Sequence, residues 1–543
     1  ARLVAKGYKV AICEQMEDPA LAKGLVKRGV IRVITPGTVV ESSMLDETKN
    51  NYLCSIFVDH LRAGLCFADV STGELRATLL EEDSQQRLEQ RIKDEMSRFS
   101  PRETLIHPDV TSLQGLPEFF RERLSTSLEC LGEADYSLED GMQLTLRQFG
   151  GNSLSDLELE GKPEAVRAIG ALLKYVERTQ RTGMERLDKF ELYTTAQFMR
   201  LDLNARRNLE LVETMRTKEK RGSLLWTLDR TKTAMGKRLI RSWLERPLLS
   251  PAQIVRRQNA VQELVEDAMM RDAVSEQLSG IYDLERLMTR VVYGSANGRE
   301  LRSLGTAASR LPALREAIRE SKSSMLFQFY QDIDPLDDIC DLVNRAIVDD
   351  PPFSIREGGI IRPGYSEELD QLTGDMTNGK GFLAQIEAKE RERTGIPKLK
   401  IGYNRVFGYY IEISNSYKNQ APPEYVRKQT LANCERFITP ELKDLESRIL
   451  GAHERSIQLE TQLFDEVRTQ IANQLSRVQN TASMIAQLDV LTSFAEVSAA
   501  NDYVRPTINL SGKIILKDSR HPVVEALSRG APFVPNNVEL DSG

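Results

Sequence analysis

A long stretch without proline constrains the fold of this chain more than any other feature. Between Pro440 and Pro506 the sequence contains no proline. Apolar residues recur there at every fourth position, at Leu459, Leu463, Val467, Ile471 and Leu475. This repeat predicts an amphipathic helix with one apolar and one charged face. If the helix is continuous, about 60 residues at a rise of about 1.5 Å each span on the order of 90 Å.

The start of this helix is marked by Thr439-Pro440-Glu441. Threonine can cap the free amides of a first turn, proline suits the first helical position, and the acid favours the helix dipole. A second helix is expected over residues 367–393, and between the two lies KIGYNRVFGYYIEIS, residues 400–414. This segment reads as two short strands around a turn. The expected arrangement is a helix leading out, a small β tip and a long helix returning.

Side chains alternate between the two faces of a strand. Lys398, Lys400, Gly402 and Asn404 should therefore share one face of the tip, and Leu399, Ile401 and Tyr403 the other. The first face is basic and the second can pack. We expect Tyr409, Tyr410 and Ile411 to form the small core of the tip rather than platforms for base stacking.

The charge balance makes the tip stand out. The chain has 543 residues, with 73 basic against 80 acidic ones and a net charge of -7, so any nucleic-acid site must be a local patch. From Ile396 to Arg436 there are seven basic and three acidic residues, a local balance of +4. Ammonium, guanidinium and amide donors suit phosphate oxygens, but no element here is suited to reading bases in a groove. The alternative is that these lysines only keep an exposed hairpin soluble.

The remaining chain predicts several further domains. Residues 1–38 read as a helix end, a strand over 8–12, a helix and a strand over 30–34. Strands of alternating character (YLCSIFVD, AGLCFADVS and ELRATLL), a turn at Thr72-Gly73 and a helix near 84–98 predict an α/β unit between 51 and 160. Residues 163–350 read as almost entirely helical. The fold class expected is therefore multidomain α+β.

The cysteines and histidines indicate neither a disulfide framework nor a metal site. Six cysteines are scattered without a C-x-x-C pair, and four histidines lie far apart. This pattern is typical of a reducing cytoplasm. No apolar run approaches the roughly 18 to 20 residues of a membrane helix, so we expect a cytoplasmic protein with no membrane partner.

Several segments, in order, resemble the MutS family of DNA mismatch-repair proteins, specifically its bacterial branch. IPKLKIGYNRVFGYYIEIS and YVRKQTLANCERFITPELK resemble the family's clamp, and VAICEQMEDPALAKGLVKRGVIRVITPGT the end of its mismatch-binding domain. FADVSTGEL resembles its RNase H-like connector, and LDLNARRNLEL, LDRTKTAMGKRLIRSWLERPL and LERLMTRV its helical lever. SRHPVVE and FVPNNVEL resemble the start of its ATPase domain.

The resemblance implies a fold of six parts. They are the end of the mismatch-binding domain (1–38), an RNase H-like α/β connector (39–162), a first helical part of the lever (163–379), a small β-containing clamp (380–439), a returning lever helix (440–504) and the start of an ATPase domain (505–543). The lever's long helices would run antiparallel with the clamp at their tip.

The resemblance also implies site residues. The family's contacts to the DNA backbone fall on Asn404, Lys428, Asn433 and Arg436, with Lys400, Arg405 and Arg427 as plausible neighbours. The aromatic residue that packs against the adenine of ATP matches Phe533, with Val534 and Asn536 near the base. His521 is expected to be structural.

Two family motifs are missing. The G-x-x-x-x-G-K-[ST] phosphate loop occurs nowhere in these residues, and neither does the mispair-reading Phe-x-Glu of the first domain in its expected place. We therefore expect a piece of a longer protein, without catalytic residues of its own. ATP and magnesium belong to the full-length family, and we expect neither to bind this piece tightly.

The function implied is mismatch recognition. The full-length family protein would be a homodimer that binds duplex DNA with mispairs, couples ATP binding and hydrolysis to movement of the clamp, associates with the nucleoid when bound, and meets downstream repair proteins. Two alternatives stay open: a helical scaffold whose hairpin contacts proteins, and a recombination-type relative that binds DNA junctions, although such relatives lack the segment 10–38. A nuclease would need clustered carboxylates, and the strands of the α/β unit offer only Asp59 and Asp69.

Overall fold

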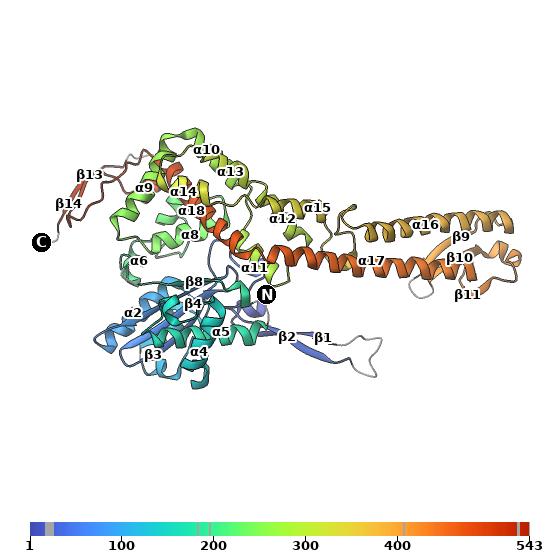
Figure 1. The fold of residues 1–543 in the computed structure, drawn as a ribbon, viewed down its shortest axis with the longest axis horizontal. Helices are drawn as coiled ribbons and strands as arrows, with labels where there is room; N and C mark the ends of the chain where they lie inside the picture. The colour runs from blue at the N-terminus through green and yellow to red at the C-terminus, as the bar shows by residue number, and fades with distance from the viewer. Residues whose placement is uncertain are drawn as a thin grey trace. The chain divides into compact units, whose positions relative to one another are not determined.

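A computed structural model describes residues 1–16, 26–113, 115–181, 184–194, 197–404, 408–528 and 533–541, without the side chains of 375–380. The chain divides into two compact units. The first comprises Ala1–Ala296, Ser303–Cys340 and Ile471–Gly543, and the second Asn297–Arg302 and Asp341–Gln470 (Figure 1). Helices and sheets occur in both units, which confirms the multidomain α+β class.

A six-stranded sheet forms the centre of the N-terminal half of the first unit. Its strand order is β7-β6-β3-β4-β5-β8. β3, β4 and β5 pair antiparallel, whereas β6, β7 and β8 each join parallel to a neighbour. The strands are β3 (Leu53–Asp59), β4 (Arg62–Asp69), β5 (Glu74–Glu81), β6 (Glu103–Ile106), β7 (Ser127–Cys130) and β8 (Lys189–Leu192).

Helices cover both faces of this sheet. α5 (Pro163–Gln180) and α4 (Leu138–Phe149) pack on one face, and α2 (Gln85–Phe99) packs on the other (Figure 1). The alternating character of the sequence is not matched by alternating burial in β3. Residues 53–58 are all buried, because a sheet enclosed by helices on both sides buries successive side chains alike.

Three glycines allow backbones to approach closely here. A Cβ added at Gly64 of β4 would overlap the carbonyl oxygen of Glu164 in α5, and one at Gly170 of α5 would overlap the Cα of Gly141 in α4. At the β4–β5 turn, Gly73 has a φ of +81°, in the left-handed region that favours glycine. The turn expected at Thr72-Gly73 is confirmed.

The expectation of an almost entirely helical stretch from 163 to 350 is wrong at Lys189–Leu192, which form the strand β8. β8 pairs there with Glu74–Ala77 of β5 and completes the edge of the sheet. The sheet and its helices therefore extend past residue 162. The helices that follow are α6 (Leu203–Asn208), α7 (Leu224–Leu228), α8 (Ala234–Glu245), α9 (Pro251–Glu266), α10 (Ala268–Leu278), α11 (Leu284–Val292), α12 (Gly298–Ala308), α13 (Leu311–Ala317), α14 (Ser324–Asp332) and α15 (Asp337–Ala346).

The long returning helix is interrupted once. Two residues separate α17 (Pro440–Ala472) from α18 (Leu475–Ala500), and the amide of Gln474 donates to the carbonyl of Ile471 at 2.9 Å in a tighter turn. Asn473, a poor helix former, lies at the break. The start of α17 is as predicted, because the Thr439 hydroxyl accepts a bond from the Leu442 amide. α16 (Glu367–Thr394) is also confirmed.

Towards each end of the chain lies a small two-stranded sheet, β1-β2 and β13-β14. The other short elements are α1 (Arg2–Ala5), β1 (Val10–Gln15), β2 (Arg28–Ile34), α3 (Gly115–Phe119), β13 (Ile514–Ser519), α19 (Pro522–Leu527) and β14 (Asn536–Leu540). The helix expected between β1 and β2 falls largely on residues 17–25, outside the described residues. Across the described parts of the chain, none of the helices is long and apolar enough to cross a membrane.

Candidate nucleic-acid interface

The basic segment between α16 and α17 folds into a four-stranded antiparallel sheet, which we call the tip sheet. Its strands are β9 (Lys400–Asn404), β10 (Gly408–Ser414), β11 (Val426–Thr430) and β12 (Cys434–Ile438), in the order β11-β12-β10-β9. Ile411, Ile413 and Phe437 form its buried core. Tyr409 packs against this core, so the expectation for Tyr409 and Ile411 is confirmed. Tyr410 is buried too, but alternation along β10 places it on the other face with Glu412, under the Arg436 guanidinium, so the expectation that it belongs to the core is wrong.

Carboxylates of the two flanking helices hold the tip sheet in place. Glu387 of α16 accepts the amide of Ile401 at 2.7 Å, and Glu446 of α17 accepts the amide of Tyr409 at 3.0 Å. A Cβ at Gly408 would overlap the Glu446 carboxylate, so this anchor requires glycine at that position. The sheet is therefore fixed at both β9 and β10.

A third anchor joins α16 to the start of β11. The Tyr425 hydroxyl donates to Glu390, whose carboxylate also pairs with Arg393 at 2.7 Å. Burial alone would raise the pKa of Glu390, but the bonds from Arg393 and Tyr425 lower it. Burial, and then the bond to Glu390, raise the pKa of Tyr425. The phenol therefore stays protonated and keeps donating at neutral pH.

One face of the tip sheet carries a polar row across all four strands. Lys400 lies opposite Glu412, Glu412 opposite Arg436, and Arg436 opposite Gln429. Directly opposed residues project to the same face. Asn404 and Gly402 share this face and Ile401 shares the other with the core, so the predicted division into a basic and a packing face is confirmed.

Arg436 is held within this row. Its Nε pairs with Glu412 at 3.1 Å, its Nη1 donates to Gln429 at 3.0 Å, and its guanidinium lies 4.2 Å from the centre of the Tyr410 ring. Only 18% of the side chain is exposed. Much of its hydrogen-bonding capacity therefore serves the sheet itself.

Lys428 occupies a β-bulge. The pairing of β11 with β12 shifts between Arg427 and Gln429, which leaves Lys428 as the extra residue without a partner in the register. Its side chain is exposed on an edge strand. Bulges redirect side chains out of the regular ladder, so this ammonium is free of the constraints that hold Arg436.

The other predicted contacts are spread around the sheet. Arg427 lies opposite Phe437, on the packing face, where its 62% exposed side chain approaches Glu435 at 3.4 Å. Asn433 is exposed next to β12, and its carbonyl accepts the Asn415 amide at 3.1 Å. Asn404 is half-buried at the end of β9. Arg405 lies outside the described residues.

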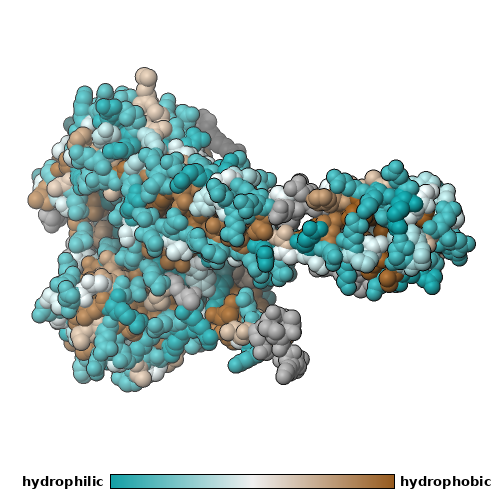
Figure 2. Space-filling view, turned by 45° about the vertical axis from the view of Figure 1, so that its right-hand side comes forward, coloured by the Kyte–Doolittle hydropathy of each residue, from teal (hydrophilic) through white to brown (hydrophobic). Residues whose placement is uncertain are grey.

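In this segment the acidic side chains pair with arginines and not with lysines, a difference that the sequence analysis missed. The three carboxylates Glu412, Glu424 and Glu435 each pair with an arginine. Within the described residues, the lysines make no ion pair, and all are exposed, namely Lys398, Lys400, Lys418 and Lys428. Lys398 and Lys418 were counted in the basic balance but not singled out. The excess charge is therefore carried by ammonium groups, on a surface that Figure 2 shows as mainly hydrophilic.

The second predicted site lies near the C-terminus. Phe533 is half-buried, Val534 is 74% exposed, and Asn536, the first residue of β14, donates to the Val534 carbonyl at 3.1 Å. His521 caps α19, since its Nδ1 accepts the Val524 amide at 3.4 Å, as expected of a structural residue.

The acids of the six-stranded sheet are not arranged as metal ligands. Asp59 lies opposite Arg62 at one end of the β3–β4 pair, and Asp69 lies opposite Glu74 at the far end of β4. Asp69 is buried and accepts bonds from Asn50, Asn51 and Ser71. In the described part of the chain, no three histidine, cysteine or acidic side chains gather as a metal site would require.

Three models of known protein families match this chain. The model of MutS domain III matches residues 204–495, that of MutS domain II residues 51–191, and that of MutS domain I residues 1–43. The chain belongs to the MutS family.

Curated relatives agree with this assignment. The DNA mismatch repair protein MutS of Acetivibrio thermocellus is 44% identical over 541 residues, and that of Ruminiclostridium cellulolyticum is 45% identical over 541 residues. Each alignment covers 100% of this chain, but 62% and 61% of the respective relatives. The chain thus spans about three-fifths of the length of these MutS proteins. The resemblance seen in the sequence is confirmed.

Proposed function

We propose that this chain is the DNA-contacting part of a mismatch-repair protein, and that the tip sheet binds the sugar-phosphate backbone of duplex DNA. The names of its relatives support a role in mismatch repair. The tip sheet adds a surface whose chemistry suits a polyanion.

The observation that carries this proposal is the division of charge on the tip sheet. The carboxylates are paired with arginines, whereas four exposed lysines have no acidic partner within the described residues. Lysine is a mobile point charge that binds phosphate without the directional fork of arginine. Contacts of this kind fix a protein on DNA but carry no sequence information.

The finer parts of the proposal follow the family. The six-stranded sheet with its helices would be the RNase H-like connector, the helices that follow the lever, and the tip sheet the clamp. β13 and β14 would begin an ATPase domain, with Phe533 against adenine and Val534 and Asn536 beside the base. In the longer proteins of the family, ATP with magnesium would then drive movement of the clamp in a homodimer that meets downstream repair proteins.

A salt titration of DNA binding tests the role of the tip sheet. The double variant Lys400→Gln/Lys428→Gln should bind a duplex more weakly than the parent chain. The slope of log K against log salt should fall by about 0.9 for each lysine that contacts a phosphate. A duplex with a mispair and one without should respond alike, because backbone contacts do not read bases. Lys513→Gln, an exposed lysine of the C-terminal segment, is the matched control.

Two results would contradict the assignment. If the double variant and Lys513→Gln gave the same affinity and slope as the parent, the tip sheet would not contact phosphates, and a scaffold that contacts proteins would be the better description. If the double variant preferred or rejected four-way junctions selectively, a junction-binding relative would be favoured instead.

A further inference from the structure

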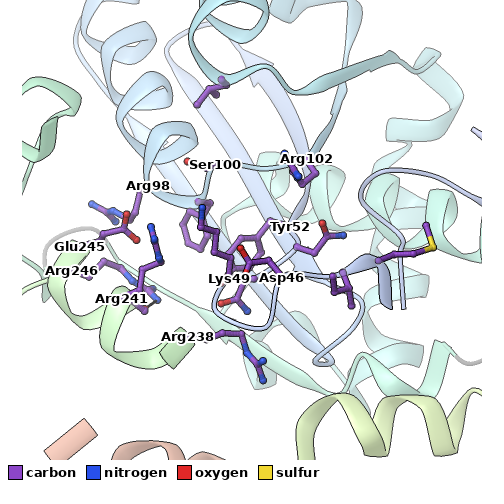
Figure 3. A pocket seen from close by; sticks show the side chains of 17 residues that line it. Asp46, Lys49, Tyr52, Arg98, Ser100, Arg102, Arg238, Arg241, Glu245 and Arg246 are labelled. Atoms are coloured by element: carbon purple, nitrogen blue, oxygen red, sulfur yellow. Dashed lines mark hydrogen bonds between the residues drawn. The ribbon is translucent and has the colours of Figure 1, made fainter. Parts of the chain in front are cut away.

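A cavity of about 290 Å³ lies in the first compact unit, at some distance along the chain from the tip sheet. Three segments and Leu124 line it. The segments are the loop of residues 44–52 before β3, the end of α2 with residues 98–102, and the last turns of α8. Tyr52 and Phe99 contribute aromatic rings to its wall (Figure 3).

The lining of the cavity is strongly basic. Six cationic side chains face two carboxylates, those of Asp46 and Glu245. The cationic residues are Lys49, Arg98, Arg102, Arg238, Arg241 and Arg246. This excess of positive charge is confined to the cavity, because the chain as a whole has a net charge of -7.

Two of these cations are already neutralised. Arg238 pairs with Asp283 at 2.7 Å and with Glu285 at 2.8 Å, and Arg98 pairs with Glu95 at 3.1 Å. Lys49, Arg102, Arg241 and Arg246 make no direct ion pair within the described residues. The cavity therefore keeps more positive than negative charge after its internal pairs are formed.

Arg246 is held by the Ser242 hydroxyl, to which it donates, and by two aromatic rings. Arg246 is 8% exposed, and its guanidinium lies over the rings of Phe99 and Phe198 at 5.5 and 5.6 Å. In the part of the chain that the structure describes, the Nε of Arg241 is buried without an acceptor. Figure 3 shows Arg98, Arg241, Glu245 and Arg246 on one side of the cavity, with Lys49, Asp46 and Tyr52 nearer its middle. Burial raises the pKa of Glu245 despite three nearby guanidinium groups.

The wall of the cavity is fixed in advance. Arg286 donates to the carbonyls of Asp46 and Lys49 at 3.0 and 2.8 Å, and Arg238 donates to the carbonyl of Glu47 at 3.3 Å. These bonds hold the loop against the helices. A wall that is ordered before binding lowers the entropy lost when a ligand binds.

We propose that this cavity binds a small phosphate-bearing anion, held by Arg241, Arg246 and Lys49. Guanidinium groups match the oxygens of a phosphate in pairs, and stacked arginines present that fork in a fixed orientation. The volume lies near the lower limit of small-ligand pockets and is too small for a nucleic-acid duplex. A bound anion would tie the sheet to α8 and stabilise the folded chain by mass action.

Calorimetric titration of the 543-residue chain with inorganic pyrophosphate tests this proposal. At ionic strength held constant with chloride, we expect saturable binding at one site and a rise in the melting temperature. Arg241→Gln should weaken binding about tenfold, because it removes a charge-assisted contact. Glu245→Gln should strengthen binding, since it removes a negative charge from the cavity wall. Arg147→Gln, which alters an exposed ion pair far from the cavity, is the matched control.

Several results of this titration would show that the cavity does not bind a phosphate-bearing anion. Absence of saturable heat, or equal affinity in the parent, Arg241→Gln and Glu245→Gln, would overturn it. If Arg241→Gln did not fold, Lys49→Gln would serve instead, because that side chain is exposed. A signal that depended on Arg241 with a single-stranded oligonucleotide but not with pyrophosphate would also overturn it. The test is independent of the tip sheet, so failure of DNA binding there would leave it unaffected.

Discussion

Arg238 of α8 donates to Asp283 from both terminal nitrogens of its guanidinium group, at 2.7 Å from Nη1 to Oδ2 and 2.8 Å from Nη2 to Oδ1. The same Nη2 donates to Glu285 at 2.8 Å. Burial alone would raise the pKa of Glu285, but Lys189 and Arg238 lower it to about 2. The arginine therefore stabilises two carboxylates at the junction of α8 and α11.

Removing this arginine should destabilise the first unit strongly. In Arg238→Met both carboxylates lose a buried partner, and we expect a loss on the order of 3 to 5 kcal/mol in the free energy of unfolding. Urea unfolding followed by circular dichroism measures this. Arg147→Met breaks an exposed pair with Glu177 and should change stability by less than about 1 kcal/mol. Similar losses in both variants would contradict the assigned role.

Asp489 should make stability depend on pH in the mildly acidic range. It holds the two residues before α8 by accepting the amides of Lys232 and Thr233 at 2.9 and 2.8 Å, yet its burial outweighs these bonds and raises its pKa to about 6. A carboxyl whose pKa is raised on folding contributes its stability at low pH and loses it as the pH rises through about 4 to 6.

The variant Asp489→Asn removes this titration. Relative to the variant, the parent chain should lose about 1 kcal/mol between about pH 5 and pH 7.5. Melting temperatures of both proteins across this range measure the difference. A difference that stayed constant with pH would show that the carboxyl does not titrate there.

Arg186 is expected to destabilise the chain. The side chain is 0% exposed, and among the described residues none of its guanidinium nitrogens has a hydrogen-bond acceptor. Its guanidinium lies 5.0 Å from the centre of the Tyr293 ring. Burial lowers its pKa to about 10. Arg186→Met, a side chain of similar length, should therefore raise the free energy of unfolding by up to a few kcal/mol. The melting temperature should rise with it. Arg186→Lys keeps the charge and should not do so; a lower melting temperature for Arg186→Met would refute the expectation.

Close backbone contacts around the six-stranded sheet predict that adding a single methyl group at two glycines destabilises the fold. Gly64→Ala would force apart β4 and α5, and Gly170→Ala would force apart α4 and α5. We expect each to cost at least about 2 kcal/mol. Gly132→Ala has open space around its added Cβ and an ordinary φ, so it is the control. Thermal unfolding of the three variants provides the comparison.

Two basic residues of the tip sheet should behave differently when truncated. Arg436→Ala removes contacts to Glu412, Gln429 and Tyr410, and should lower both DNA affinity and the thermal stability of the second unit. Lys428→Ala removes an unpaired side chain and should lower affinity alone. Filter binding together with calorimetry separates the two effects. Loss of stability in Lys428→Ala would contradict the assigned bulge.

Local sequence signals predicted the tip sheet and its helices well. Thr439 and Pro440 mark the start of α17, and alternation along residues 398–404 separates the two faces, because both signals depend on neighbours in the chain. The pairing of Glu412 with Arg436 depends instead on the register of β10 with β12. That register is set by packing, and it places Arg436 beside a carboxylate, so its charge is paired within the sheet.

Long-range contacts also explain the expectations that were wrong. β8 lies more than a hundred residues after its partner β5, so nothing near Lys189 indicates a strand. The sequence around β3 does not show that both faces of this strand are covered, because the helix α5, which covers one of them, follows much later in the chain. The basic cavity likewise combines residues near positions 46, 98 and 241, which no local pattern connects.

The bulge at Lys428 gives β11 one residue more than its partner needs. Deletion of that residue would leave Arg427 opposite Phe437 and Gln429 opposite Arg436, so the strand would stay in step with β12. Deleting a neighbouring residue of a regular strand would instead turn the side chains beyond it to the opposite face. Position 428 is therefore where the chain length of this sheet can vary among related proteins without rebuilding it.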